Sequence, residues 1–130
     1  CYEIIFPGSV VSSNDRPKWI LNITNDAWFG ASAGPSQHFA SAIMRAVEEG
    51  IPVIRVANTG ISGVIDPYGR VLKKLNIGEM GIIDSSLPVS LSSRTLFSEY
   101  GNLIPLLLIL IGFSSAFYYK VRTLGINEGY

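Results

Sequence analysis

The sequence has little that could build a metal centre or a disulfide framework. Its 130 residues include one cysteine and one histidine, which excludes a disulfide scaffold and a four-cysteine zinc site. It also lacks an excess of either charge, because 10 Lys and Arg balance 10 Asp and Glu; a nucleic-acid partner is therefore not expected. The hydrophobic content of 48% excludes a disordered chain. We expect one ordered domain at most, with no metal, cofactor or nucleic acid bound.

Apolar segments alternate with turn residues in the manner of an α/β domain. Residues 19–24 are rich in β-branched and aromatic side chains, which is typical of a buried strand. Residues 35–49 carry an apolar stripe at helical spacing, with Pro35 at the start and Gly50 after the end. The stripe consists of Phe39, Ile43, Ala46 and Val47. Further strands are expected at residues 51–57, 61–65 and 70–75, with a type I turn at 66–69, a short fifth strand at 81–85 and an irregular segment at 87–100.

Residues 101–119 contain no charged side chain and predict a transmembrane helix. A helix over residues 103–119 would be about 25 Å long. A buried core helix is the alternative, but this segment has no polar face. Lys120 and Arg122 place positive charge on the C-terminal side, which favours a cytoplasmic tail at 120–130 and a domain on the opposite face of the membrane. The expected organisation is an α/β domain at 1–87, a linker at 88–100, the membrane helix at 101–119 and the tail.

Cys1 is the one thiol, and its residue type alone leaves several interpretations open. A lone cysteine is often an inert, small apolar residue. It could also be an N-terminal nucleophile, the lipid-bearing first residue of a lipoprotein, or a catalytic cysteine from the interior of a longer chain. The lipoprotein interpretation predicts a flexible polar tether, whereas large apolar residues follow Cys1.

Several short blocks of the sequence are distinctive when taken together. The first is residues 1–7 (CYEIIFP), and the others are 22–30 (NITNDAWFG), 34–38 (GPSQH), 45–48 (RAVE), Pro52, Arg55, 58–60 (NTG) and 65–69 (IDPYG). In this order they resemble the nitrilase superfamily and, within it, the apolipoprotein N-acyltransferases. Residues 1–7 resemble the segment that holds the nucleophile. The sequence departs from the family at Gly8 and residues 9–16, where family members usually have a longer helix.

The resemblance implies an α/β fold, namely the C-terminal part of a nitrilase-like α-β-β-α sandwich followed by one transmembrane helix. It implies that Cys1 is the catalytic nucleophile, that the backbone N–H of Tyr2 donates to an oxyanion, and that Glu3 orients the site. On an extended segment, Glu3 would point to the same side as Cys1. It also implies that Trp28 and Phe29, exposed in a glycine-rich loop, contact an acyl chain.

By the same resemblance, the family's Glu and Lys have no counterpart in these residues. We therefore expect a C-terminal piece of a longer protein that is inactive alone. His38 lies on a helix that is structural in the family, so we expect it to be buried and hydrogen-bonded rather than catalytic; Asn58 and Gly60 are expected to shape a turn.

The implied reaction is N-acylation of bacterial lipoproteins at the inner membrane, with the catalytic domain in the periplasm and the C-terminus in the cytoplasm. A phospholipid would donate an acyl group to Cys1, and the thioester would pass it to the α-amino group of an apolipoprotein. One alternative is a membrane-anchored carbon-nitrogen hydrolase, an amidase or nitrilase that uses water. Another is a membrane-anchored binding domain without enzymatic activity.

Overall fold

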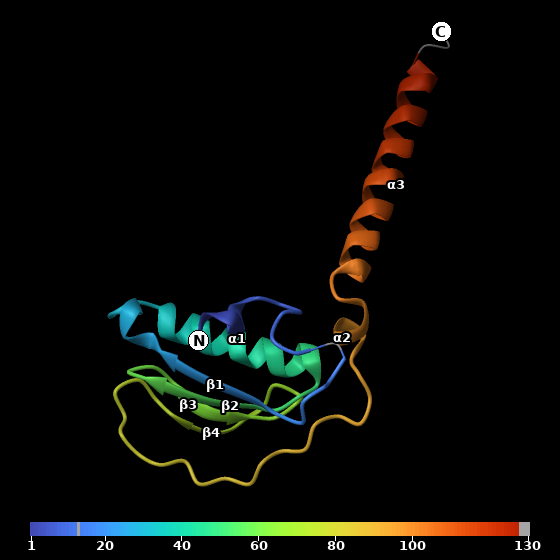
Figure 1. The fold of residues 1–130 in the computed structure, drawn as a ribbon. Coiled ribbons are helices and arrows are strands. Elements are labelled where there is room, and N and C mark those ends of the chain that lie inside the picture. The colour runs from blue at the N-terminus through green and yellow to red at the C-terminus, as the bar shows by residue number, and fades with distance from the viewer. Residues whose placement is uncertain (13, 128–130) are drawn as a thin grey trace. The chain divides into compact units, whose positions relative to one another are not determined.

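The computed structural model describes residues 1–12 and 14–127, without the side chains of 124–127. It divides into two units, Cys1–Glu99 and Tyr100–Tyr130. In the first unit a mixed sheet carries a long helix on one face (Figure 1). The second unit contains one long apolar helix. An α/β domain and an apolar C-terminal helix, both predicted from the sequence, are thus confirmed.

The sheet has four strands in the order β1 (Ile20–Asn25), β2 (Val53–Asn58), β3 (Ser62–Ile65) and β4 (Val71–Leu75). β1 and β2 are parallel and are connected through α1 (Gly34–Glu49), whereas the other neighbours are antiparallel. A crossover helix is what two parallel neighbouring strands require. These four strands, the helix and the β3–β4 hairpin agree with the sequence-based predictions.

Polar side chains on β1 and β2 face α1. Along β1, Asn22 and Thr24 are buried, while Leu21 and Ile23 are exposed on the other face. The same holds on β2, where Arg55 is buried. This reverses the usual alternation of a half-buried strand, in which apolar residues face the core. On the other face of β1 and β2, Leu21, Ile23 and Val56 are exposed, as expected of a sheet that packs against a further layer in a sandwich.

An apolar core lies beside these polar groups. It is formed by Ile4, Phe39, Ala42, Ala46, Val53 and Ile65. Ile4 comes from η1 (Tyr2–Ile5), a single turn of 3-10 helix. An extended course for this segment, assumed when Glu3 was placed on the same side as Cys1, is therefore wrong. The turn closes with a hydrogen bond from the Phe6 amide to the Glu3 carbonyl, 3.0 Å.

Two other local predictions need correction. Residues 81–85 do not form a strand, because this segment contacts the side chains of β4 rather than its backbone: the Lys73 ammonium donates to the Asp84 carbonyl. Residues 87–100 are not wholly irregular, since α2 (Leu96–Tyr100) forms at their end. The Thr95 hydroxyl accepts from the Ser98 amide at 3.0 Å and so caps this helix.

The C-terminal end of α1 carries two glutamates, although carboxylates there oppose the helix dipole. Glu48 pairs with Arg45 at 2.7 Å, and Glu49 accepts from the Ser98 hydroxyl at 2.9 Å. The Arg16 guanidinium donates to the carbonyls of Glu49 and Gly50, at 2.9 and 3.2 Å. These partners offset the unfavourable placement. The buried face of α1 also includes His38 and Arg45.

The apolar stripe predicted for α1 is only partly confirmed. Phe39 and Ala46 are buried, but Val47 is 44% exposed. The buried stripe instead continues through Ala42, which packs in the core.

In the second unit, α3 (Leu103–Asn127) is long and apolar enough to cross a membrane. Its apolar part, Leu103–Thr123, has 21 residues and a mean hydropathy of 1.7; at 1.5 Å per residue this is about 30 Å. α3 continues through Lys120 and Arg122, beyond the membrane span predicted for residues 101–119. Charged residues end the apolar stretch of the sequence, but they are compatible with a helix that continues. Residues 128–130 of the predicted tail lie outside the described residues.

Candidate active site

Cys1 lies where the N-terminal turn η1 passes β1. Its Sγ is 2.9 Å from the hydroxyl oxygen of Thr24, a residue on the α1 side of β1. The Cys1 side chain is 54% exposed. It borders an open hollow of about 390 Å³, which Glu3, Ser9, Val10 and residues 20–23 of β1 also line. The one thiol is thus both accessible and held by a hydrogen-bonding neighbour.

Behind Thr24 lies a buried polar network centred on Asp26. The Thr24 hydroxyl donates to Asp26 Oδ1 at 3.4 Å. His38 Nδ1 is 2.8 Å from the same oxygen. Arg55 Nη2 donates to the other oxygen, Oδ2, at 2.7 Å. Asp26 and Arg55 are each 1% exposed, so water does not replace these partners. Hydrogen bonds therefore connect the Cys1 thiol, through the Thr24 hydroxyl and the Asp26 carboxylate, to the Arg55 guanidinium.

Arg55 has further acceptors that hold it under α1. Its Nη1 donates to the Asn22 side-chain oxygen, and its Nε donates to the Ile61 carbonyl at 3.2 Å. Burial lowers the pKa of Arg55 from its ordinary value, and the charge of Asp26 opposes this shift. A buried cation is stable only with such a partner. Asn22, Asp26 and Arg55 therefore form a rigid support for β1.

The hydrogen positions on His38 follow from its partners. His38 Nδ1 lies 2.8 Å from Asp26 Oδ1 and 3.2 Å from Arg55 Nη2. The shorter contact, to a carboxylate oxygen that accepts, is a hydrogen bond when Nδ1 carries the ring hydrogen. Nε2 is buried and has no hydrogen-bond partner among the described residues. His38 is buried and hydrogen-bonded, as the sequence predicts. It does not contact Cys1 through any hydrogen bond that the structure describes.

The turn at residues 58–60 packs directly onto Asp26. Thr59 adopts a left-handed conformation, with φ of 59°. A Cβ added at Gly60 would lie 2.1 Å from Asp26 Oδ2, so only glycine fits without displacing the carboxylate. This geometry agrees with the prediction that Asn58 and Gly60 shape a turn.

Tyr2 and Glu3 follow Cys1 within η1. The N–H of Tyr2 belongs to the first residue of the turn, where amides lack an acceptor within the helix. The Tyr2 ring packs edge-on against Phe6, with centroids 5.9 Å apart. The Glu3 side chain is 74% exposed. The oxyanion role of Tyr2 and the orienting role of Glu3 stay predictions.

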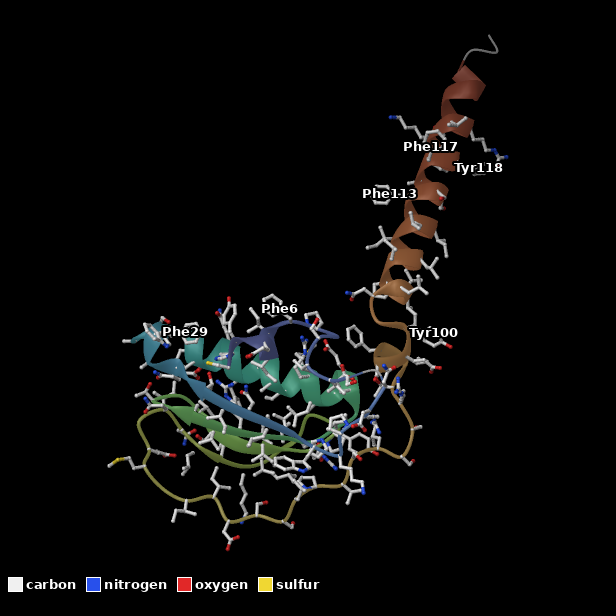
Figure 2. All side chains as sticks on the ribbon, in the orientation of Figure 1. Phe6, Phe29, Tyr100, Phe113, Phe117 and Tyr118 are labelled. Atoms are coloured by element: carbon white, nitrogen blue, oxygen red, sulfur yellow. The ribbon has the colours of Figure 1, made fainter. Side chains whose placement is uncertain are left out.

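The aromatic pair of the glycine-rich segment lies in η2 (Asp26–Phe29), one turn of 3-10 helix rather than an open loop. Trp28 is 85% exposed, in agreement with the expectation of an accessible aromatic ring. Phe29 is partly buried, so the expectation that it is exposed holds less well. Its ring meets His38 edge-on, with centroids 5.6 Å apart, and covers the backbone of Gly34; it lies near the start of α1 (Figure 2). Acyl-chain contact by Trp28 and Phe29 stays a prediction.

Sequence reasoning assigned no role to Thr24, Asp26 or Arg55. Two signals could have indicated them. Arg55 is the one charge within an apolar strand, which implies a buried counterion. Asn22 and Thr24 occupy alternate positions of β1 and therefore share one face. As for metals, the residues that the structure describes contain no group of three His, Cys, Asp or Glu that could hold an ion.

Comparisons with known proteins match the part of the chain that contains this site. The family model for carbon-nitrogen hydrolases matches residues 1–95. Curated relatives include the apolipoprotein N-acyltransferase of Rickettsia bellii, 51% identical over 113 residues that make up 87% of this chain and 23% of the relative. That of Rhodopseudomonas palustris is 48% identical over 111 residues, 85% of this chain and 20% of the relative. That of Agrobacterium fabrum is 59% identical over 87 residues, 67% of this chain and 16% of the relative.

The chain thus spans about a fifth of the length of the curated relatives that it matches. Those relatives are acyltransferases by name. The family match covers well over half of the chain and includes η1, the four strands and α1. On this match, the chain belongs to the carbon-nitrogen hydrolase family.

Proposed function

We propose that this chain supplies the nucleophile of an apolipoprotein N-acyltransferase. The observation that carries the proposal is Cys1 itself. It is the one cysteine of the chain, and its side chain is accessible beside a surface hollow. It lies within residues 1–95, which the family model matches, in a chain that is about half identical to N-acyltransferases over most of its length. A thiolate is a strong nucleophile for acyl transfer through a covalent intermediate.

The reaction runs in two steps. In the first, the Cys1 thiolate attacks the ester carbonyl of a phospholipid, and the C–O bond breaks to release a lysophospholipid that takes up a proton. The thioester is then attacked by the α-amino group of the diacylglyceryl-cysteine of an apolipoprotein. The C–S bond breaks, the amine nitrogen gives up one proton to a base, an amide forms, and the thiolate returns. Two steps suit two large lipid substrates, because they need not bind together.

Each step passes through a tetrahedral oxyanion. The backbone N–H of Tyr2 is the proposed donor from this chain, since an amide after the nucleophile often serves this purpose. Glu3 orients the segment, and Trp28 and Phe29 contact the acyl chain.

Cys1 needs a base and a cation that its neighbours in this chain do not supply. A free cysteine has a pKa of about 8.5, so little of it is thiolate at neutral pH. The neighbour of its sulfur is the neutral Thr24 hydroxyl. The family resemblance gives the two missing roles to a Glu and a Lys without counterparts here. We therefore propose that activity requires a longer polypeptide.

The second unit supports a membrane location. The apolar part of α3 carries no charged residue before Lys120. With Lys120 and Arg122 on the cytoplasmic side, the catalytic domain faces the periplasm, at the bacterial inner membrane. A membrane anchor keeps Cys1 near a phospholipid donor and a lipid-bearing acceptor.

The deciding experiment is Cys1→Ser in the complete product of the gene. Transfer of a labelled acyl chain from phospholipid to a diacylglyceryl peptide should fall by at least a thousandfold, and the labelled thioester should disappear. Membrane insertion should be unchanged, because Cys1 is not buried in the core. Ser9→Ala, at the same hollow, serves as the control and should retain both signals. Retained transfer in the Cys1→Ser variant would place the nucleophile elsewhere.

A carbon-nitrogen hydrolase that uses water is the second candidate, favoured by the family match itself. It would share the thioester on Cys1 and differ in the acceptor. Release of free fatty acid or carboxylate without transfer to a peptide amine would support this candidate.

A further inference from the structure

The proposed role of Cys1 does not explain the buried, hydrogen-bonded network centred on Asp26. Asp26, His38 and Arg55 are all at least nine-tenths buried, and no step above uses them. They connect to the surface through the hydroxyl of Thr24, which touches Cys1 Sγ at 2.9 Å. We propose that Thr24 is a positioning residue whose hydroxyl changes hydrogen-bond partner when the Cys1 thiolate forms. This inference rests on the proposed role of Cys1.

The partners of Asp26 show why the hydroxyl is free to change. Asp26 Oδ2 accepts from Arg55 at 2.7 Å, and Oδ1 is 2.8 Å from His38 Nδ1. The Thr24 hydroxyl is the third and most distant donor, at 3.4 Å. The carboxylate therefore remains paired on both oxygens when Thr24 turns away. If the Thr24 hydroxyl had no second partner, turning away from Asp26 would leave a buried hydroxyl without a hydrogen bond, which is unfavourable in free energy.

The hydroxyl has one hydrogen and two lone pairs, so it can serve the sulfur in either state. With the neutral thiol, Cys1 S–H donates to Thr24 Oγ1, and the Thr24 hydrogen points to Asp26. When a carboxylate base takes the thiol proton, rotation about the Thr24 Cβ–Oγ1 bond directs the hydroxyl hydrogen to the thiolate. No proton leaves Thr24. The hydrogen bond to the anion lowers the free energy of the thiolate and fixes its direction of attack.

The backbone makes this arrangement rigid. Thr24 lies on β1, which pairs with β2 in parallel register, Thr24 opposite Ala57. Arg55 on β2 is bound to Asp26 just beyond the end of β1. The turn at Gly60 closes over Asp26 and leaves no room for a Cβ. Thr24 therefore cannot follow the sulfur by moving its backbone, and only the hydroxyl rotates.

The test uses the complete product of the gene and two readouts, acyl transfer and alkylation of Cys1 by iodoacetamide from pH 6 to 10. Thr24→Val keeps the shape and removes the hydroxyl. It should raise the pH midpoint of alkylation by about one to two units and slow transfer about tenfold to a hundredfold, as expected for a hydrogen bond to a charged group. Thr24→Ser should restore both values to within a few fold. Thr123→Val on α3, an equivalent exchange away from the site, should change neither.

The charged groups around the thiol are the same in every variant. Glu3 lies on its own segment. Asp26 lies on η2, His38 on α1 and Arg55 on β2. A shift of the alkylation midpoint that follows the hydroxyl alone therefore cannot come from them.

The test distinguishes failure of the positioning role of Thr24 from failure of the nucleophile role of Cys1. An unchanged midpoint and unchanged transfer in Thr24→Val would overturn the positioning role, while loss of transfer in Cys1→Ser would still support the nucleophile. Equal loss in Thr24→Val and Thr24→Ser would assign the effect to packing and overturn the inference. Where Thr24→Val fails to fold, Thr24→Ser and Thr24→Ala form a second pair that differs only in the hydroxyl, and equal behaviour of that pair likewise overturns it.

Discussion

Single side chains in this chain hold whole turns in place, and Asp66 is the clearest case. Its carboxylate accepts from the amides of Tyr68 and Arg70, both at 2.9 Å, and from the Arg70 guanidinium at 2.6 Å. Burial by itself would raise the pKa of Asp66, but these hydrogen bonds and the charge of Arg70 outweigh it and lower the pKa below its ordinary value. The Asp-Pro-Tyr-Gly turn predicted from the sequence owes its shape to these contacts.

Asp66→Asn should therefore loosen the β3–β4 turn. One amide oxygen cannot replace two carboxylate oxygens, so we expect a local loss of about 1–3 kcal/mol. Hydrogen exchange of the Tyr68 and Arg70 amides, in the complete gene product, measures it. Because the folded-state pKa is lowered, the stabilisation is present above pH about 4 and is lost as pH falls through the folded-state pKa. Wild-type protection factors should fall in that range, whereas those of Asp66→Asn should stay flat. Asp84→Asn is the control, and a flat wild-type profile would contradict the argument.

Single residues also limit what the sequence alone could predict about the site. The motif at residues 1–7 identified Cys1 without any structure. Thr24 and Asp26 lie in the 22–30 block and Arg55 is a separate match. Their relation in space depends on β1 and β2 pairing in parallel, with Asn22 opposite Arg55. Hydrogen bonds between residues about thirty positions apart follow from that register, which no local pattern encodes.

At the scale of elements, the ends of helices depend on partners from distant segments. Arg16 comes from the loop before β1, yet it donates to the last carbonyls of α1 and to the Leu91 carbonyl at 2.9 Å. Arg16 therefore links the loop before β1, the end of α1 and the segment at Leu91. A cation at a helix C-terminus also complements the helix dipole.

Removal of that cation should free the loop and the segment near Leu91. For Arg16→Gln we expect a local loss of about 1–3 kcal/mol, since hydrogen bonds from a charged donor disappear. The Leu91 amide, which donates to the Gly50 carbonyl at 2.9 Å, should exchange at least fivefold faster. Lys18→Gln removes an exposed charge from the same loop and should leave this rate unchanged. Equal exchange in the wild type and Arg16→Gln would mean that the guanidinium contacts carry no stability.

Prediction from sequence worked best for elements with a strong period. The strand at β1 and the helix α1 were found because apolar spacing and terminal Pro and Gly residues agree. The 81–85 strand was wrong because β-propensity gives no information on whether a neighbouring backbone is available. α2 was missed because its Thr95 cap is recognisable only once the helix is known to form.

At the scale of the whole molecule, the uncovered face of the sheet argues for a larger assembly. Leu21, Ile23 and Val56 are each at least 50% exposed, and exposed apolar surface of this kind marks an interaction site. With the family's Glu and Lys lacking counterparts, the 130 residues alone should form no acyl-thioester when given phospholipid. Mass spectrometry of Cys1 after incubation checks this, with the complete gene product as the positive control. A burst of acyl-thioester on the isolated chain would overturn the prediction.

The direction of α3 across the membrane gives another whole-molecule prediction. A fluorescent protein fused to the C-terminus should be active and thus cytoplasmic, while a periplasmic phosphatase fused there should be inactive. The reason is the cost of moving Lys120 and Arg122 across the bilayer. Lys120→Glu with Arg122→Glu should weaken this preference, and Thr123→Val is the neutral control. Phosphatase activity in the unmodified chain would reverse the proposed orientation.

The order of residues along the chain was enough to predict the α/β class, the helix and strands with strong periodicity, the apolar C-terminal helix and Cys1 as the candidate nucleophile. These depend on residue order along the chain, which local sterics and burial convert into structure. The tertiary structure decided which polar groups support that thiol. Parallel pairing of β1 and β2 brings Thr24 and Arg55 to one face, and the close approach of Gly60 fixes Asp26 between them. Contacts of this kind arise only when distant segments pack, because the free energy of pairing buried polar groups has no local signature.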